Sequence, residues 1–150
     1  MSGKTRGYAL RVDVGAGAER VWAALTDVAR LARWCGPGAK FAARQGGLVR
    51  LSVDPATTFE ACVDVFDAPR RLRMIHMPGS VLPTSPTAMV DDLIVEPRGA
   101  ITVVRLLGSG FPAGPEYDGA TRAHETGWRR ALARLKVYLE KKMDNPETTP

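Results

Sequence analysis

The sequence predicts an α+β fold in which one antiparallel sheet packs against a long C-terminal helix. The first observation is a helical periodicity near the end of the chain, where large apolar residues recur at spacings of three and four: Trp128, Leu132, Leu135 and Leu139. The second is the order of the elements, in which a strand and two short helices precede a succession of strands and the long helix comes last. Successive strands favour antiparallel pairing, and an apolar helix face must be buried against another layer.

The N-terminal segment predicts a strand followed by two short helices. Apolar and charged residues alternate from Tyr8 to Val14, as in a half-buried strand, and Gly15-Ala16-Gly17 ends it. Apolar residues then recur at helical spacing over Ala18–Trp34. Because Asp27 can cap a second helix, we expect two short helices with a bend between them.

The middle of the chain predicts the remaining strands, and its Gly- and Pro-rich stretches predict loops. The expected strands span residues 40–43, 48–53, 59–66, 72–77, 89–95 and 101–107. Residues 78–88 and 108–119 are expected to be loops, and Asp118 is the expected N-cap of the final helix. We therefore predict one domain over residues 8–142, with an N-terminal tail (1–7) and a disordered C-terminal tail (143–150).

Composition is typical of a soluble globular domain, with 45% hydrophobic and 25% charged residues in 150. The net charge of +5 invites a nucleic-acid function, but the basic residues are scattered and lack interleaved aromatic residues, so we expect no nucleic-acid partner. The sequence has no apolar run of about 20 residues, which argues against membrane insertion.

Residues 1–7 have no signal-peptide core, and we expect a cytoplasmic protein. Cys35 and Cys62 are too few for a disulfide framework.

Short segments spread along most of the chain occur in the order of a known superfamily. They are Val21-Trp22, Ala24–Asp27, Arg33-Trp34, Gly46-Gly47, Phe66–Leu72, Ser109–Phe111, and Gly127-Trp128 with the three leucines that follow. Together they resemble the SRPBCC superfamily of START-like and birch-pollen-allergen-like proteins, and more narrowly its bacterial branch similar to activators of the heat-shock chaperone ATPase. The resemblance implies a helix-grip fold, a curved antiparallel sheet of about six or seven strands around the C-terminal helix, with a cavity between them.

The resemblance implies much less about function, because this fold serves lipid carriers, hormone receptors, cyclases and co-chaperones. The sequence also departs from the family pattern at two positions. Gly108 stands where the family often has a polar residue or histidine, and His76 stands where it often has an aromatic residue. The lining of the cavity is therefore particular to this chain.

His76 and Asp91 are the candidate catalytic residues. The two-residue period of a strand places His76 on the inward face with Met74, and Asp91 on the inward face of the next strand with Leu93. A histidine beside a carboxylate can accept a proton or orient a polar ligand group. The alternative is a rim position for His76, with hydrogen bonds to backbone or water. Asp92 adjoins Asp91, so a shift of one residue would exchange them.

The expected cavity lining adds aromatic and apolar residues to this pair. His124 lies one helical turn before Trp128, near the expected cavity mouth, and we expect it at the surface. With two histidines and no metal-ligand spacing in the sequence, we expect neither a metal site nor a cofactor. The full set of expected ligand-binding residues is Trp34, Met74, His76, Asp91, Leu93, Phe111, Tyr117, His124, Trp128 and Leu132.

The outer face of the sheet is a candidate dimer interface. If Leu93 faces inward, the alternation directs four apolar residues outward: Val90, Ile94, Val103 and Leu107. An exposed apolar patch of this kind favours a homodimer.

Three functions remain open from the sequence. The first is a binding or carrier domain for a small apolar or amphipathic molecule, oriented by His76 or Asp91. The second is an enzyme of the polyketide cyclase or dehydratase type, with His76 as general base and Asp91 as its orienting partner. The third, which the resemblance alone suggests, is a co-chaperone that activates a heat-shock ATPase through its surface.

Overall fold

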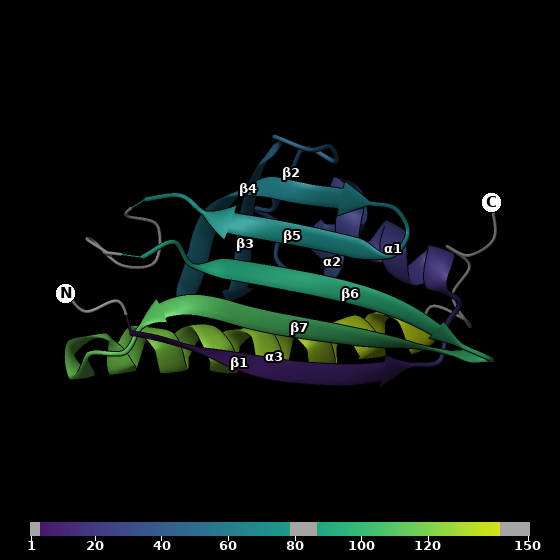
Figure 1. Ribbon diagram of the computed structural model, residues 1–150. Helices are drawn as coiled ribbons and strands as arrows, with labels where there is room; N and C mark the ends of the chain where they lie inside the picture. Colours follow the sequence, from purple (N-terminus) through teal and green to yellow (C-terminus); the bar gives the residue numbers. More distant parts are fainter. Residues whose placement is uncertain (1–3, 79–86, 142–150) are drawn as a thin grey trace.

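The computed structural model describes residues 4–78 and 87–141, which form one curved antiparallel sheet with helices on one face (Figure 1). The strand order is β1-β7-β6-β5-β4-β3-β2. The elements are β1 (Thr5–Val14), α1 (Ala18–Thr26), α2 (Val28–Trp34), β2 (Lys40–Phe41), β3 (Leu48–Asp54), β4 (Thr57–Asp67), β5 (Arg71–His76), β6 (Val90–Arg98), β7 (Ile101–Pro112), a short 3₁₀ helix (Pro115–Tyr117) and α3 (Asp118–Lys141). The helix-grip fold predicted from the sequence is confirmed.

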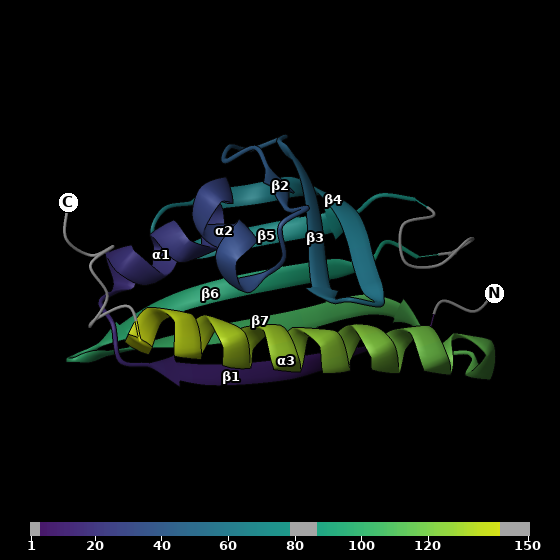
Figure 2. The same ribbon diagram turned by 180° about the vertical axis from the view of Figure 1, so that it is seen from behind.

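The long helix α3 lies along the inner face of the sheet (Figure 2). It packs against β1 at one edge and against β3 near the other, which requires the sheet to curve around it. Gly127 allows this close approach, because a Cβ at that position would collide with a side-chain methyl of Val53 on β3. The apolar stripe predicted for the helix is buried against the sheet at Trp128, Leu132, Leu135 and Leu139.

The two short helices are also confirmed. Asp27 caps α2, since its carboxylate accepts a hydrogen bond from the backbone N–H of Ala29 at 3.0 Å. Trp22 and Trp34 are both buried in the main core. No helix among the described residues has the length and hydropathy needed to cross a membrane.

The main corrections concern the edge strand and its neighbour. β1 begins at Thr5, inside the expected tail, and β7 continues to Pro112, through a stretch expected to be a loop. The two extensions pair with each other, Thr5 opposite Pro112, so each supplies the backbone partners that the other needs. The glycines that suggested a loop are accommodated within the strand, and Gly110 adopts a φ of 79° there. The expected tail 143–150 and most of the loop 78–88 lie outside the described residues.

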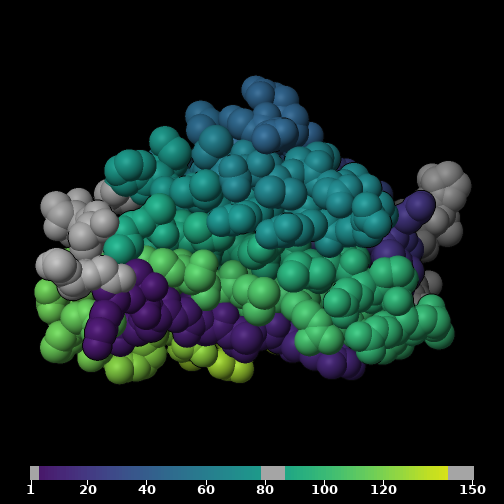
Figure 3. All heavy atoms as spheres, in the orientation of Figure 1, coloured from purple at the N-terminus to yellow at the C-terminus, as the bar shows by residue number. Residues whose placement is uncertain are grey.

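The expected apolar patch on the outer face is smaller than predicted. Figure 3 shows this face as a continuous surface of β1, β7, β6 and β5. Val103 is 0% exposed and Val90 is 8% exposed, so the prediction that they form an exposed patch is wrong. Val103 lies between Asp13 and Glu96 in register, and the ion pairs of these residues flank it. Leu107 is 40% exposed and Ile94 is half-buried, and they are what remains of the patch.

Candidate functional site

Three ionisable side chains from three elements meet inside the domain. His76 is the last residue of β5, Asp91 is the second residue of β6, and His124 lies in the second turn of α3. The Nε2 atoms of His76 and His124 lie 2.7 Å and 2.8 Å from the same carboxylate oxygen, Oδ2 of Asp91. No side chain in this cluster is more than 1% exposed. We call these three residues the His–Asp–His cluster.

The carboxylate of Asp91 accepts four hydrogen bonds. Besides the two imidazoles, the indole N–H of Trp128 donates to Oδ2 at 3.2 Å, and the hydroxyl of Tyr8 donates to Oδ1 at 2.7 Å. An ionised carboxylate can only accept, so each imidazole donates its Nε2–H to Asp91. This arrangement determines the orientation of both rings.

The protonation of Asp91 and Tyr8 follows from these contacts. Burial raises the pKa of Asp91, but the rings of His124 and His76 and their hydrogen bonds outweigh burial and hold this pKa well below its usual range. Burial and the neighbouring Asp91 carboxylate raise the pKa of Tyr8 far above its ordinary value. Asp91 is therefore the ionised acceptor of the cluster, and Tyr8 is a neutral donor.

Three buried polar atoms around the cluster have no hydrogen-bond partner among the described residues. They are Nδ1 of His76, Nδ1 of His124 and Oγ1 of Thr121. Thr121 precedes His124 by three residues in α3, which places both side chains on the same face of the helix. Buried polar atoms without partners are uncommon and cost free energy, so they are candidates for contacts with a ligand.

Aromatic rings enclose the cluster on several sides. Phe59 stacks on His76 at 4.8 Å between ring centroids and 11° between planes, and Phe111 meets the same ring edge-on at 6.0 Å. Phe59 belongs to the main core, whereas Phe111 packs with Met89 in a second, smaller core, which Tyr8 and Tyr117 partly cover. The His–Asp–His cluster therefore lies where the two cores meet.

Gly108 makes the contact between Tyr8 and Asp91 possible. In register it pairs with Tyr8 on β1 and with Asp91 on β6, so it lies directly between them on β7. A Cβ at Gly108 would overlap the ring of Tyr8. Because Gly108 lacks a side chain, the phenol ring can cross β7 and bring its hydroxyl to Asp91. Thus Tyr8 provides a polar group beside Asp91 at the position of Gly108.

The structure brings together part of the set predicted from the sequence. His76 and Asp91 are adjacent as expected, while Asp92 points to the outer face and pairs with Arg71 at 2.7 Å. His124 was expected at the surface, and this is wrong, because its position on α3 faces the sheet and Asp91. Met74, Leu93 and Leu132 are buried in the main core.

The aromatic residues Trp34, Phe111 and Tyr117, expected to line one cavity, are not all brought together in the structure. Trp34 lies apart from the cluster and donates its indole N–H to the backbone of Ala24 at 2.9 Å. Phe111 contacts His76, and Tyr117 packs half-buried against the smaller core. Sequence reasoning did not identify Tyr8, Phe59 or Thr121.

Four surface pockets lined by described residues lie away from the cluster. One of about 420 Å³ is lined by Trp34 with other residues of α2 and α3. The others are lined by residues around the start of β2 and the end of β3, by residues around α1, and by residues of β2, β3 and β4. None of these four is lined by His76, Asp91 or His124. The cavity expected between sheet and helix therefore stays a prediction.

A comparison with protein families shows to which family this chain is related. Residues 16–140 match the family described as "Activator of Hsp90 ATPase homolog 1-like protein". The chain belongs to this family. No curated protein gives a significant match to the Hsp90-activator-like chain.

Solved structures similar to this family member share its fold. A protein from Mesorhizobium loti has 19% sequence identity and a TM-score of 0.76, over 91% of this chain and 98% of the other. An HSP90 activator from Plasmodium falciparum has 16% identity and a TM-score of 0.74, over 89% and 96%. The Aha1 dimer from Colwellia psychrerythraea has 19% identity and a TM-score of 0.70, over 90% and 96%. At these identities the likeness shows the fold alone.

The low pKa of Asp91 predicts a loss of stability in acid. A carboxyl whose pKa is lower in the folded state stabilises the fold above the unfolded-state pKa, near 4, and this contribution is lost as the pH falls toward the folded-state value. We expect the free energy of unfolding to fall more steeply below pH 4 in the wild type than in Asp91→Asn. Urea unfolding at a series of pH values measures this, and parallel curves would contradict it.

Proposed function

We propose that this domain binds a small hydroxylated aromatic molecule at the junction of its two cores. The observation that carries the proposal is the pair of unpartnered imidazole nitrogens in the His–Asp–His cluster. Since each Nε2–H is donated to Asp91, the Nδ1 of a neutral ring has a free lone pair and accepts a hydrogen bond. A ligand hydroxyl supplies such a donor, and Thr121 offers a further polar contact on the same helix face.

The aromatic surroundings support an aromatic ligand over an aliphatic one. Phe59, Phe111 and Trp128 lie around the two imidazoles, and planar rings pack against such residues in offset or edge-on geometry. Once these rings move apart, a ligand ring would pack against them while its hydroxyl reaches Nδ1. Apolar burial would supply most of the affinity, and the hydrogen bond would supply the orientation.

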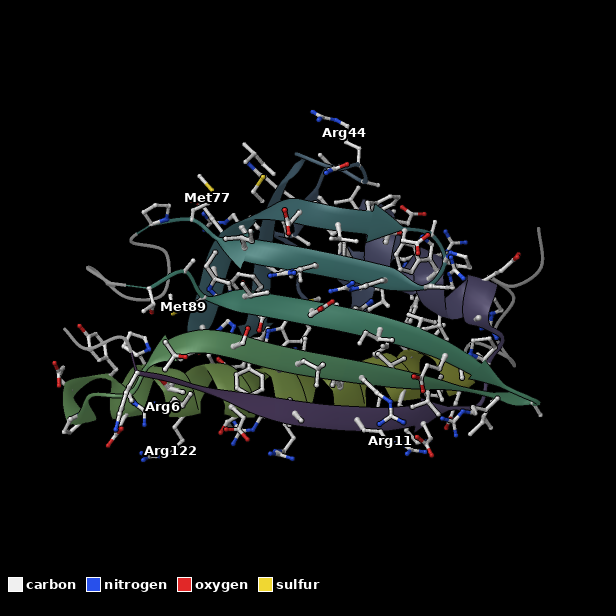
Figure 4. The ribbon with its side chains drawn as sticks, viewed as in Figure 1. Arg6, Arg11, Arg44, Met77, Met89 and Arg122 are labelled. Atoms are coloured by element: carbon white, nitrogen blue, oxygen red, sulfur yellow. The ribbon has the colours of Figure 1, made fainter. Side chains whose placement is uncertain are left out.

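Access is proposed to occur through the smaller core. Among the described residues it has two buried apolar side chains, Met89 and Phe111, whereas the main core is extensive. Met89 and Met77 lie at the same end of the sheet as Arg6 and Arg122 (Figure 4). Methionine side chains repack easily, so this end of the domain is the one that can open at least cost in free energy.

We also propose that the protein acts in the cytoplasm.

A pair of matched probes tests the proposal. In the presence of a chelator, 2-naphthol should bind about tenfold or more tightly than naphthalene, because a buried hydrogen bond to an otherwise unpaired acceptor contributes about 1–3 kcal/mol. His76→Leu should reduce this preference, while Asp92→Asn, an outer-face control, should keep it. Fluorescence titration measures the affinities, and equal wild-type affinities for the two probes would contradict the proposal.

Proton transfer is the second candidate function. The observation that favours it is the orientation of His76 by Asp91, which leaves Nδ1 as the proton acceptor. The test is exchange of the acidic C–H protons of 2-tetralone in D₂O, followed by NMR. We expect acceleration by the wild type, and loss of acceleration with retained 2-tetralone binding in His76→Ala. Equal loss of binding and exchange would count against an enzyme.

A co-chaperone role has support from the description of the family and from the Plasmodium falciparum neighbour, which is an HSP90 activator. The structure of the described residues adds nothing that favours it over ligand binding. Retention of a purified heat-shock ATPase on the immobilised protein, with stimulation of its activity, would support this role. An unchanged ATPase rate would contradict the co-chaperone role.

A homodimer through the outer face of the sheet also remains a proposal, supported by the dimer of the Colwellia relative. Leu107 is the most exposed residue of the expected patch, and charge at its centre should prevent association. We expect Leu107→Glu to convert a dimer to a monomer in sedimentation velocity, and Ile101→Glu, on the same strand but outside the patch, to have no such effect. A monomeric wild type at micromolar concentration would contradict the dimer.

A further inference from the structure

The donor atoms of the His–Asp–His cluster form a set suited to a metal ion. One atom from each of His76, Asp91 and His124 can be chosen so that all three lie within 4.8 Å of one another. These side chains come from β5, β6 and α3, so their proximity depends on the tertiary fold and no ligand spacing is visible in the sequence. The three residues are buried, so water does not solvate the charge of Asp91. A cation held by this carboxylate and two neutral imidazoles would compensate that charge.

We infer that His76, Asp91 and His124 form a binding site for a divalent transition metal, of which Zn²⁺ is the best match. This inference goes beyond the proposed aromatic ligand and does not depend on it. Two imidazole nitrogens and one carboxylate oxygen are a common protein ligand set for Zn²⁺ with one open position. Magnesium and calcium are poorer matches, because they prefer all-oxygen sites.

The two histidine–carboxylate distances require only a small expansion to admit an ion. The two Nε2 atoms lie 2.7 Å and 2.8 Å from Oδ2 of Asp91, as expected for hydrogen bonds. Zinc bonds of about 2.0–2.1 Å in tetrahedral geometry separate adjacent ligand atoms by roughly 3.3 Å. Each histidine therefore needs to part from Asp91 by about half an ångström, with the ion replacing the proton between them.

Proton and charge balance define the rest of the site. When the ion takes the Nε2 lone pairs, each ring carries its proton on Nδ1, and any excess proton of the cluster is released to solvent. Two neutral imidazoles, one carboxylate and Zn²⁺ leave one positive charge in a buried place. An anionic oxygen in the fourth position, from hydroxide or a phenolate, neutralises it.

Two further residues position the carboxylate. The Tyr8 hydroxyl holds Oδ1 of Asp91 at 2.7 Å, which leaves Oδ2 directed toward the histidines, and Trp128 lies on the other side at 3.2 Å. Groups that hold a metal ligand in this way typically change metal affinity by about 10–100-fold when removed.

The cysteines are not part of the site. Cys35 donates to the backbone of Ser52, and burial raises its pKa to about 12.

The test uses untagged protein, stripped of metal, titrated with Co²⁺ and then with Zn²⁺ in competition. We expect one ion per chain, with the visible absorption of tetrahedral Co²⁺ displaced by Zn²⁺. His124→Leu should abolish binding, and Tyr8→Phe should weaken it by about 10–100-fold. Cys62→Ser, which removes the more accessible thiol, should leave it unchanged.

The sequence contains only two histidines, so the wild type alone gives a second readout should His124→Leu fail to fold. On addition of Zn²⁺, the imidazole ¹⁵N resonances of both histidines should shift. Binding below one equivalent with unshifted imidazoles, or Co²⁺ spectra that survive in a folded His124→Leu protein, would overturn the inference. The naphthol titrations contain chelator and so do not depend on a metal. Absence of metal binding would therefore not contradict the proposed aromatic-ligand site, and absence of naphthol binding would not contradict the metal site.

Discussion

Asp91→Asn should lower the free energy of unfolding by about 3–5 kcal/mol, the cost of removing one partner from a buried charged group. The substitution keeps the size of the side chain and removes its charge. Four donors converge on this carboxylate, and an amide can accept from only some of them while its NH₂ faces other donors. Urea unfolding at neutral pH, monitored by circular dichroism, measures the change.

Asp92→Asn is the matched control. It lies next in sequence on the same strand, on the outer face, where it is 14% exposed and pairs with Arg71. Removing this ion pair should cost no more than about 1 kcal/mol. Equal losses for the two variants would show that Asp91 is not the centre of a buried charged cluster.

Gly108→Ala should cost about 3 kcal/mol, because a single methyl group disturbs two contacts together. The added Cβ overlaps the ring of Tyr8, which must move, and the movement breaks the hydrogen bond from its hydroxyl to Asp91. Hydrogen bonds to charged groups contribute about 1.5–3 kcal/mol, and a forced repacking adds to this.

A double-mutant cycle with Tyr8→Ala isolates this effect. Once the ring is absent, the methyl group at Gly108 has nothing to displace, so Gly108→Ala should then cost little. We expect a coupling of about 2 kcal/mol between the two positions. Gly17→Ala, where an added Cβ meets no atom within 4 Å, controls for the general effect of replacing a glycine. Additive losses at Gly108 and Tyr8 would contradict the account.

The fold could be predicted from the sequence because its signals are local and periodic. The spacing of Trp128, Leu132 and Leu139 defines the buried face of α3, and the strand alternation correctly placed Asp91 inward and Asp92 outward. The end of β7 could not be predicted, because Gly108 and Gly110 resemble loop residues until the pairing with β1 is known. Local composition does not reveal which strand will supply the backbone hydrogen-bond partners for this end of β7.

The site could be predicted only in part, for a related reason. His76 and Asp91 lie on adjacent antiparallel strands, and strand period and order bring them together. His124 comes from a helix packed across the sheet, and its rotation about the helix axis places it at Asp91, which sequence spacing does not show. Tyr8 comes from a strand two positions away and reaches Asp91 only because Gly108 has no side chain.

A long-range ¹H–¹⁵N NMR spectrum of the metal-free protein shows directly which nitrogen of each imidazole ring carries a proton. With two histidines in the sequence, two ring systems should be seen. We expect Nε2 to carry a proton in both rings, because both Nε2–H groups donate to Asp91. A ring with an unprotonated Nε2 and a protonated Nδ1 would contradict the arrangement on which the proposed binding site depends.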